Sequence, residues 1–589
     1  MSKLLSFLTV LVLMVAATTA LATDITISTN TVWSGTVTID GKVTLNNNAN
    51  LTIQPGTTIN FVGSTANLHI TSGGTLSALG TAAQPIYLTG SQTGLIDGAP
   101  NKGVLFDHCV ISGMGSGTAN WFNVNPQSQG FSLTNSTVTN CSRLYTAGNS
   151  GATISNCAIT NVGQWSLMNS GGDTLTGCKV NGAGKMRINS TTREEVSNNV
   201  LVNCAIWSDG SASANNILVH DNYINNTAPN AEHTGTDYGL QGIVGQVYNN
   251  FVHGASWTVG FVGGHVYNNV VEGLTASEVA GHGDTTHEQL NDFANNSVVE
   301  HNIVLNNSMG SFMTANVGLA LNCVMRNNTF DQRCAVGSTA SGVIYLNHNG
   351  GAAANMLVSN NLFMRGGRIF DETSLANAIS YVDYNGWAGR DTTDSFSGSS
   401  SKFVNIVISG KTEGDDGFGM HDVTLPTLQA GFNPASVVQN ANYTNPYTDA
   451  QMLAGTYTIS QLLSNYWQAF APTQGSALID AGDPNFLTDP NMVGGRIDIG
   501  AVEASLPVVT YLPGDADCDH KVTFADYIIL ERNFGATNAT WAMGDFNSDG
   551  KVTFADYILL ETNFGKSAPE PMTLSLLAAG AVALLRRKR

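Results

Sequence analysis

Two twelve-residue segments carry oxygen-bearing side chains at the spacing of a calcium-binding loop. They read DADCDHKVTFAD (515–526) and DFNSDGKVTFAD (545–556), and KVTFADYI recurs unchanged in both. Oxygen ligands fall at loop positions 1, 3, 5, 9 and 12, and a backbone carbonyl falls at position 7. Carboxylates held this close repel one another unless a hard cation lies between them, so we predict two bound Ca²⁺ ions. The predicted ligands are Asp515, Asp517, Asp519, the Lys521 carbonyl, Thr523 and Asp526 in the first loop, and Asp545, Asn547, Asp549, the Lys551 carbonyl, Thr553 and Asp556 in the second.

A second set of polar side chains lies in EHTGTDYGLQ (232–241) and AGHGDTTHEQLND (280–292), in a chain with only 12 histidines. Carboxylates two residues apart on one strand face stand about 6.6 Å apart, and those on neighbouring strands stand about 4.8 Å apart. Both separations are near those that glycosidases use, and histidine can move protons between such groups. We expect glycoside hydrolysis here, with a solvated loop as the alternative. The candidate catalytic residues are Asp237, His282, Asp284, His287 and Glu288.

A pair of basic residues offers a different chemistry. Lys185 and Arg187 alternate with the apolar Met186 and Ile188, so both should point outward from one strand. A polysaccharide lyase needs a base for the C5 proton and a cation that neutralises the uronate. The pair therefore supports β-elimination as the alternative reaction, although a solvated strand face accounts for it equally well.

These side chains must be positioned by the long middle of the chain, which is built from a repeated unit. Short β-branched runs begin at asparagine-rich turns, as in NSTVTNC (135), NNVLVNC (198), DNYINNT (221) and NNTFDQR (327). Units start about 20–33 residues apart, a period typical of a solenoid. Alternation should place Val, Ile and Leu inward, and the turn asparagines should hydrogen-bond down the stack. We expect no amphipathic helix between Thr23 and about Ser505.

This pattern resembles the right-handed parallel β-helix of pectate-lyase-like proteins, so we expect an all-β solenoid over residues 23–505. Only 11% of the residues are charged, and the net charge is −19. Such an acidic chain is not a nucleic-acid-binding protein, which would present a basic face. Members of the family most often cleave or bind polysaccharides. The resemblance therefore implies a polysaccharide partner on the face of the solenoid.

The cysteines follow the same repeat. Cys109, Cys157 and Cys178 occupy one register, whereas Cys141 and Cys204 occupy another. Residues stacked on adjacent coils have Cα atoms about 4.8 Å apart, which is within disulfide range. We expect at most one disulfide, between Cys157 and Cys178, and a row of buried thiols is the alternative.

After each predicted calcium loop comes one short helix, YIILERNFG or YILLETNFG. The loop–helix pairs over 513–566 resemble a type I dockerin, which implies an EF-hand-like calcium module and a cohesin-like protein partner. Phe524-Ala525 and Phe554-Ala555 replace the polar pair by which dockerins select cohesins, and His520 replaces the glycine at position six of the first loop. A calcium-stabilised spacer is therefore the alternative to cohesin docking. Residues 506–512 form a linker.

The two ends of the chain are predicted to be sorting signals. Residues 1–22 combine Lys3, an apolar stretch and Ala20-Leu21-Ala22, the pattern of a secretory signal peptide. Residues 568–589 hold Pro569-Glu570-Pro571, a short apolar stretch and four terminal basic residues, and they resemble a PEP-CTERM signal. That resemblance implies transient inner-membrane contact, removal by an exosortase-type enzyme and release outside a Gram-negative-type bacterium, at the cell surface or in the extracellular matrix. An uncleaved tail anchor is the alternative.

The sequence thus predicts a secreted, polysaccharide-active protein. We expect it to be a glycosyl hydrolase, with a lyase as the alternative enzyme. A non-catalytic β-helix that binds glycan or adheres at the cell surface is the alternative outside enzymology.

Overall fold

The protein is described here by a computed structural model. It describes residues 19–21, 24–46, 48–98, 103–115, 120–124, 130–146, 151–163, 165–166, 172–187, 194–208, 217–227, 238–254, 257–275, 278, 288–307, 322–333, 342–345, 355–365, 368–376, 379–389, 403–408, 410–427, 430–486, 496–504, 513–516, 521–537, 539, 541–547 and 550–566. The chain divides into two units, 1–504 and 505–589, which are considered separately.

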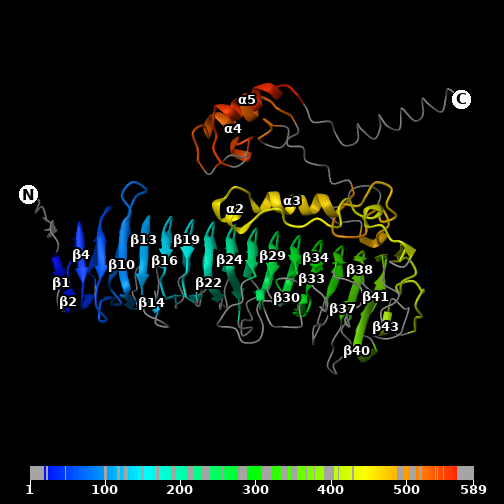
Figure 1. Cartoon of the computed structure of the whole chain (residues 1–589), viewed down its shortest axis with the longest axis horizontal. Helices are drawn as coiled ribbons and strands as arrows, with labels where there is room; N and C mark the ends of the chain where they lie inside the picture. The colour runs from blue at the N-terminus through cyan, green and yellow to red at the C-terminus, as the bar shows by residue number, and fades with distance from the viewer. Residues whose placement is uncertain are drawn as a thin grey trace, which may run out of the picture. The chain divides into compact units, whose positions relative to one another are not determined.

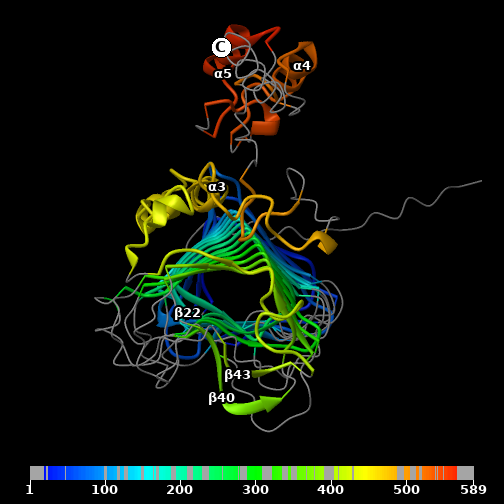
Figure 2. The same cartoon turned by 90° about the vertical axis from the view of Figure 1, so that its right-hand side faces the viewer.

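The first unit is a parallel β-solenoid of the right-handed type, with strands on three faces (Figures 1 and 2). The first face comprises β1 (Thr19–Leu21), β4 (Thr36–Ile39), β7 (Thr58–Phe61), β10 (Ile86–Thr93), β13 (Cys109–Met114), β16 (Thr137–Thr139), β19 (Ala158–Thr160), the first halves of β22 (Lys179–Arg187) and β24 (Val200–Trp207), β26 (Tyr223–Asn226), β29 (Phe251–Gly254), β31 (Val270–Glu272), β34 (Ile303–Asn306), β36 (Thr329–Gln332), β39 (Leu362–Met364), β42 (Gly386–Ala388) and β44 (Val423–Thr424). Strand β1 falls within the predicted signal peptide.

The other two faces follow in each coil. The second face comprises β2 (Ile25–Ile27), β5 (Lys42–Leu45), β8 (Asn67–Ile70), β11 (Leu95–Gly98), β14 (Asn120–Val124), β17 (Arg143–Thr146), β20 (Trp165–Ser166), the second halves of β22 and β24, β27 (Tyr238–Gln241), the start of β30 (Trp257–Tyr267) and β32 (Glu288–Phe293). The third face comprises β3 (Thr31–Trp33), β6 (Asn50–Ile53), β9 (Thr75–Leu79), β12 (Val104–Asp107), β15 (Phe131–Thr134), β18 (Ala152–Ser155), β21 (Thr174–Thr176), β23 (Glu194–Ser197), β25 (Ile217–His220), β28 (Val244–Tyr248), the end of β30, β33 (Val298–Glu300), β35 (Val324–Arg326), β38 (Met356–Ser359) and β41 (Ile379–Asp383). A separate parallel sheet joins β37 (Gly342–Tyr345), β40 (Arg368–Ala376) and β43 (Phe403–Val407).

The predicted alternation of inward and outward residues is confirmed. In β4 the side chains of Val37 and Ile39 are buried, and in β8 those of Leu68 and Ile70 are buried, while their neighbours are more exposed. Parallel pairing sets each coil directly on the next, so the inward residues form one continuous hydrophobic core.

The predicted asparagine ladder is also confirmed, at the turn from the third face to the first. One residue of each turn has a positive φ, such as Asn249 at +52°. The residue after it points inward, and its Nδ2 donates to Oδ1 of the next asparagine over 2.9–3.1 Å. The ladder consists of Asn199, Asn222, Asn250, Asn269, Asn302, Asn328, Asn361 and Asn385, all buried.

Cysteines continue this ladder toward the N-terminal end of the solenoid. The amide of Cys178 donates to Oδ1 of Asn199 (2.9 Å), and the amide of Cys157 donates to Sγ of Cys178 (3.4 Å). Ser136 takes the same place in the coil before, where its hydroxyl accepts from the amide of Cys109. The shared register of Cys109, Cys157 and Cys178 is therefore confirmed. All three are buried, unbridged thiols in this structure.

The expectation of no amphipathic helix before about Ser505 is wrong. Helices α2 (Asp449–Ala454) and α3 (Ile459–Phe470) lie along the first face (Figure 1). Each starts with a capping box, from Thr448 and Thr458. The apolar side of α3 buries Leu462, Tyr466 and Phe470 against outward residues of the first face, including Tyr223 and Phe251. Two 3₁₀ turns, Pro434–Ser436 and Pro484–Phe486, flank the two helices. We call residues 430–486, which pack against the first face, the strap.

The second unit holds helices α4 (Phe524–Arg532) and α5 (Phe554–Asn563) and a 3₁₀ turn, Trp541–Met543. Its two halves are related by the sequence repeat: Val522 pairs through its backbone with Gly565 and Lys566, and Val552 pairs with Gly535 and Ala536. Six residues form its core: Ala516, Val522, Leu530, Phe546, Val552 and Leu560. Among the described residues, none of the helices is long and apolar enough to cross a membrane.

Candidate functional site

The structure leaves most of the sequence-predicted catalytic residues undescribed. Asp237, His282, Asp284 and His287 lie outside the described residues. Glu288 begins β32 on the second face, where its backbone pairs beside Trp257, and only its backbone is described.

The lyase pair is also described through its backbone alone. Lys185 and Arg187 lie in the second half of β22, paired with Ala205 and Trp207 on the second face, and Met186 between them is buried. The basic pair and Glu288 therefore share a face but occupy different coils.

The best-described polar cluster lies on the third face instead. The residue just before each positive-φ turn points outward, because the residue before it and the ladder asparagine after it point inward. Parallel pairing aligns these outward positions coil upon coil. The third-face row is Ser197, His220, Tyr248, Tyr267, Glu300 and Arg326.

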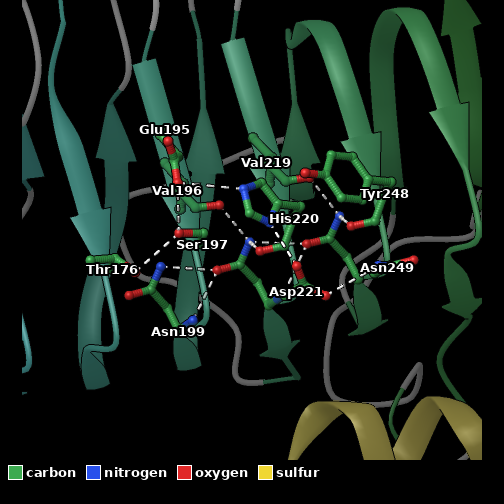
Figure 3. A network of polar contacts seen from close by, with 12 residues as sticks. Thr176, Glu195, Val196, Ser197, Asn199, Val219, His220, Asp221, Tyr248 and Asn249 are labelled. Carbon is green, nitrogen blue, oxygen red and sulfur yellow. Dashed lines mark hydrogen bonds and ion pairs between the residues drawn. The ribbon is translucent and has the colours of Figure 1, made fainter. Parts of the chain in front are cut away.

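His220 stands between two carboxylates (Figure 3). Its Nδ1 lies 2.7 Å from Oδ2 of Asp221, and its Nε2 lies 3.6 Å from Oε1 of Glu195 on the preceding coil. The imidazole is 14% exposed, and the two carboxylates are 37% and 30% exposed. Asn249 donates to the other oxygen of Asp221 (3.2 Å) and Ser197 donates to Glu195 (3.3 Å). The carboxylates are thus held in place while remaining accessible to solvent.

Aromatic rings continue the row. The His220 and Tyr248 rings stack with centroids 4.6 Å apart and 3° between their planes, and the Tyr248 and Tyr267 rings stack at 4.8 Å and 8°. His265 packs against Tyr267 at 4.2 Å. Because the rings cover one another's faces, they offer their edges, and not their faces, to a ligand. Burial, and to a smaller extent the neighbouring Tyr248, raises the pKa of Tyr267, which keeps its phenol protonated.

Glu300 closes the described part of this cluster. It lies 2.7 Å from Nε2 of His265 and 2.6 Å from Nε of Arg326. Burial by itself raises the pKa of Glu300, but the hydrogen bond from His265 and the charge of Arg326 outweigh it, so the pKa lies below its usual value. Glu300 therefore stays ionised and is unsuited to act as a general acid.

A further cluster lies on the third face near its C-terminal end. Nδ1 of His421 is 2.9 Å from Oδ2 of Asp383 and 3.8 Å from Oδ1 of Asp416, and the His421 ring stacks on Tyr384. The three side chains have donor atoms close enough to share a cation. However, buried Asp383 already accepts from the amides of Gly417, His421 and Tyr384, which accounts for its position as the anchor of this turn.

The second unit offers the sites predicted for calcium. In each loop the carboxylates at positions 1 and 12 are buried: Asp515 and Asp526, and Asp545 and Asp556. Asp526 accepts from the amides of Ala516 and Thr523, and Asp556 accepts from those of Phe546, Asn547 and Thr553. Two buried carboxylates within twelve residues repel each other, so the donor set fits a divalent cation.

Several predicted calcium ligands cannot be placed. Asp517, Asp519 and Asp549 lie outside the described residues. Thr523 and Thr553 are the N-caps of α4 and α5, and Gly550 has a positive φ of +80°, as a tight loop requires. Lys521 and Lys551 follow in the described part of each loop, with exposed side chains.

The third-face row was missed from the sequence, although a signal for it exists. Each member directly precedes an Asn-Asn, Asp-Asn or His-Asn pair of the repeat, as His220 precedes Asp221-Asn222. Aligning the repeats on that pair would have placed the row in a single column.

Comparison with known proteins agrees with this architecture. The class is a parallel β-solenoid, and residues 21–100 match the family described as a pectate-lyase like beta helix domain. Among solved structures, the chain is similar to the Dettilon tailspike protein (gp208), at 13% identity and a TM-score of 0.27, covering 54% of this chain and 62% of that one. It is also similar to a tailspike mutant of E. coli bacteriophage HK620 in complex with a pentasaccharide, at 16% identity and a TM-score of 0.20, covering 68% of this chain and 73% of that one. A third similar structure is a mutant of the periplasmic alginate epimerase AlgG, at 11% identity and a TM-score of 0.14, covering 69% of this chain and 77% of that one. No curated protein matches the sequence.

Proposed function

We propose that this protein is an exported, polysaccharide-active β-solenoid that binds a linear glycan along its third face. The observation that carries this proposal is the third-face row, in which a hydroxyl, an imidazole, two phenols, a carboxylate and a guanidinium follow one another from coil to coil. Strands repeat about every 4.8 Å along the stack, so the row presents hydrogen-bonding groups at regular intervals along one line. A polymer with many hydroxyl groups matches such a line, because each hydroxyl both donates and accepts.

Glycoside hydrolysis is the reaction that we propose for this surface, supported by His220 between Glu195 and Asp221. In hydrolysis one carboxyl group protonates the leaving oxygen, and a second carboxylate activates water or attacks the sugar. An imidazole in contact with both carboxylates can return the proton between turnovers. The structure holds these three groups in one cluster from two adjacent coils.

The test is to incubate the full chain with a panel of plant and algal polysaccharides. Reducing ends report hydrolysis, absorbance of unsaturated uronates reports β-elimination, and retention on immobilised glycan reports binding alone. Glu195→Gln should abolish release of reducing ends without lowering the melting temperature, whereas Asp284→Asn and Glu288→Gln test the rival site predicted from the sequence. If Glu195→Gln is fully active and Asp284→Asn is inactive, the chemistry belongs to that rival site. Binding without either product would make the protein a non-catalytic glycan-binding protein.

We further propose that the second unit binds two Ca²⁺ ions through the oxygen atoms of its two loops. Bound calcium would neutralise the buried carboxylates Asp515, Asp526, Asp545 and Asp556 and so stabilise the fold of the unit. The exposed Phe524 and Phe554 rings, 63% and 64% accessible, offer an apolar surface to a protein partner in place of the polar pair by which dockerins select cohesins. Calorimetry on the chain with and without chelator tests the calcium proposal: no uptake of Ca²⁺ would contradict it.

Export is the remaining part of the proposal. A signal peptide over residues 1–22 and a sorting tail over 568–589 would carry the protein across the inner membrane and release it at the cell surface. Mass spectrometry of the extracellular product tests this. A product that begins near residue 23 and lacks the four terminal basic residues is expected, and a full-length intracellular product would refute it.

A further inference from the structure

We propose that the third face selects an uncharged polysaccharide and excludes polyuronates. This inference rests on the proposed function, since it names the class of glycan for that same surface. Its basis is the balance of charges among the outward side chains of the third face.

Acidic side chains dominate this face. Glu195, Asp221 and Glu300 all lie within the cluster around the third-face row, and Asp107 lies on the same face toward its N-terminal end. Within the described third-face strands, Arg326 is the one Lys or Arg residue. Since Nε of Arg326 lies 2.6 Å from Glu300, its positive charge is already compensated within the protein.

The described histidines around the third-face row do not change this balance. His220 is shared between two carboxylates, and His265 lies against Glu300, so a protonated imidazole on this face is also offset by a nearby negative charge. The basic residues Lys185 and Arg187 belong to the second face. Among the described residues of the row, a polyuronate, which carries one carboxylate on every sugar, would therefore meet like charges and cations that are already paired with carboxylates.

Neutral sugars suit the same groups. Carboxylates accept hydrogen bonds from sugar hydroxyls, phenols both donate and accept, and such bonds to ionised acceptors are stronger than those between neutral groups. A neutral glycan thus gains from Glu195 and Asp221, whereas an anionic glycan is repelled by them.

The experiment compares retention of the full chain on neutral polysaccharides, such as galactan and a β-glucan, with retention on polygalacturonate and alginate. Each glycan is tested at low and physiological salt, and with and without added Ca²⁺, because a divalent cation can bridge two sets of carboxylates. We expect binding to at least one neutral glycan and no binding to either polyuronate. Tight binding to a polyuronate through the third face, with or without Ca²⁺, would overturn the inference and leave the proposed function intact.

Two variants assign the effect to this face. The double variant Glu195→Gln, Asp221→Asn keeps the shape of both side chains and removes two negative charges, so it should produce measurable retention on polyuronate at low salt. The matched control is Asp97→Asn, which removes a carboxylate paired with His69 at 2.6 Å on the second face and should leave polyuronate affinity unchanged. An equal effect of the two changes would mean that net charge alone is responsible and would refute the assignment. If the unaltered chain binds none of the glycans, the proposed function and this inference are both refuted.

Discussion

Replacing one residue of the asparagine ladder should destabilise the solenoid more than replacing its half-buried neighbour Asn268. Nδ2 of Asn269 donates to the carbonyls of Val247 (2.8 Å) and Tyr267 (3.0 Å) and to Oδ1 of Asn302 (2.9 Å). Its Oδ1 accepts from both N and Nδ2 of Asn250, at 3.0 and 2.9 Å. Asn269→Leu keeps about the same volume but removes all five hydrogen bonds, and it leaves the buried backbone N–H of Asn250 without an acceptor, whereas Nδ2 of Asn250 keeps the carbonyls of Val219 and Tyr248.

An unsatisfied buried donor costs about 1–3 kcal/mol, so the backbone N–H of Asn250 makes the expected loss of stability about 1–3 kcal/mol. Asn268→Gly is the control, because Asn268 has a φ of +55°, a conformation that glycine adopts without strain. Chemical denaturation gives the change in stability, and hydrogen exchange of the Val247–Phe251 amides shows whether the loss is local. A loss below about 1 kcal/mol for Asn269→Leu, or an equal loss for Asn268→Gly, would refute the reasoning.

Three further predictions concern the strap, a charged pair and the calcium loops. Thr458→Ala removes the N-cap of α3 and should cost about 1 kcal/mol, measured by denaturation against Thr458→Ser as control. Nε2 of His253 lies 3.3 Å from Oε1 of Glu278. Burial by itself raises the pKa of Glu278, but the hydrogen bond from His253 outweighs it and lowers that pKa to about 2. Burial by itself lowers the pKa of His253, but the contact with Glu278 outweighs it and raises that pKa. Ionised Glu278 therefore stabilises the folded state above about pH 4.5, and this contribution is lost as the pH falls; protonated His253 stabilises the folded state below about pH 6.5, and that contribution is lost as the pH rises. The difference in unfolding free energy between Glu278→Gln and the unaltered chain should therefore be largest between about pH 4.5 and 6.5. A difference that does not change with pH would contradict this prediction. Finally, Asp526→Asn with Asp556→Asn should abolish the rise in melting temperature that added Ca²⁺ produces, and a retained rise would rule out these ligands.

The sequence predicted the regular parts of the solenoid because each of them repeats. The Asn-Asn pairs fixed the turn, and through the turn they fixed which side chains point inward, down to the register shared by Cys157 and Cys178. Helix α3 occurs only once, so the repeat pattern could not predict it. However, Thr458-x-x-Gln461 before an apolar run is a capping-box signature that indicates the start of a helix.

The candidate site was harder to predict for a physical reason. Glu195 and His220 are 25 residues apart in sequence and approach each other only because one coil stacks on the next. His, Asp and Glu are dense in the segment around Asp284, whereas the third-face row takes a single residue from each successive coil. A column of side chains is a property of the register, and it becomes visible only after the repeats are aligned.

The strap of residues 430–486 has a consequence for how the rod comes apart. A stack of coils joined only to its neighbours unfolds one coil at a time from an end, as a zipper does. Here Tyr223 is hydrogen-bonded to Asp449 (2.8 Å), Glu272 to Tyr466 (2.9 Å) and Arg333 to the carbonyl of Tyr443 (2.7 Å). One segment therefore contacts coils that are two and four positions apart in the stack. Unfolding that reaches the coil of Tyr223 must therefore also break the contacts of the strap with the coils of Glu272 and Arg333. The coils bound by the strap should therefore unfold as a single cooperative unit. Proteolysis or mechanical unfolding that starts at the N-terminal end of the solenoid should slow most when it reaches Tyr223.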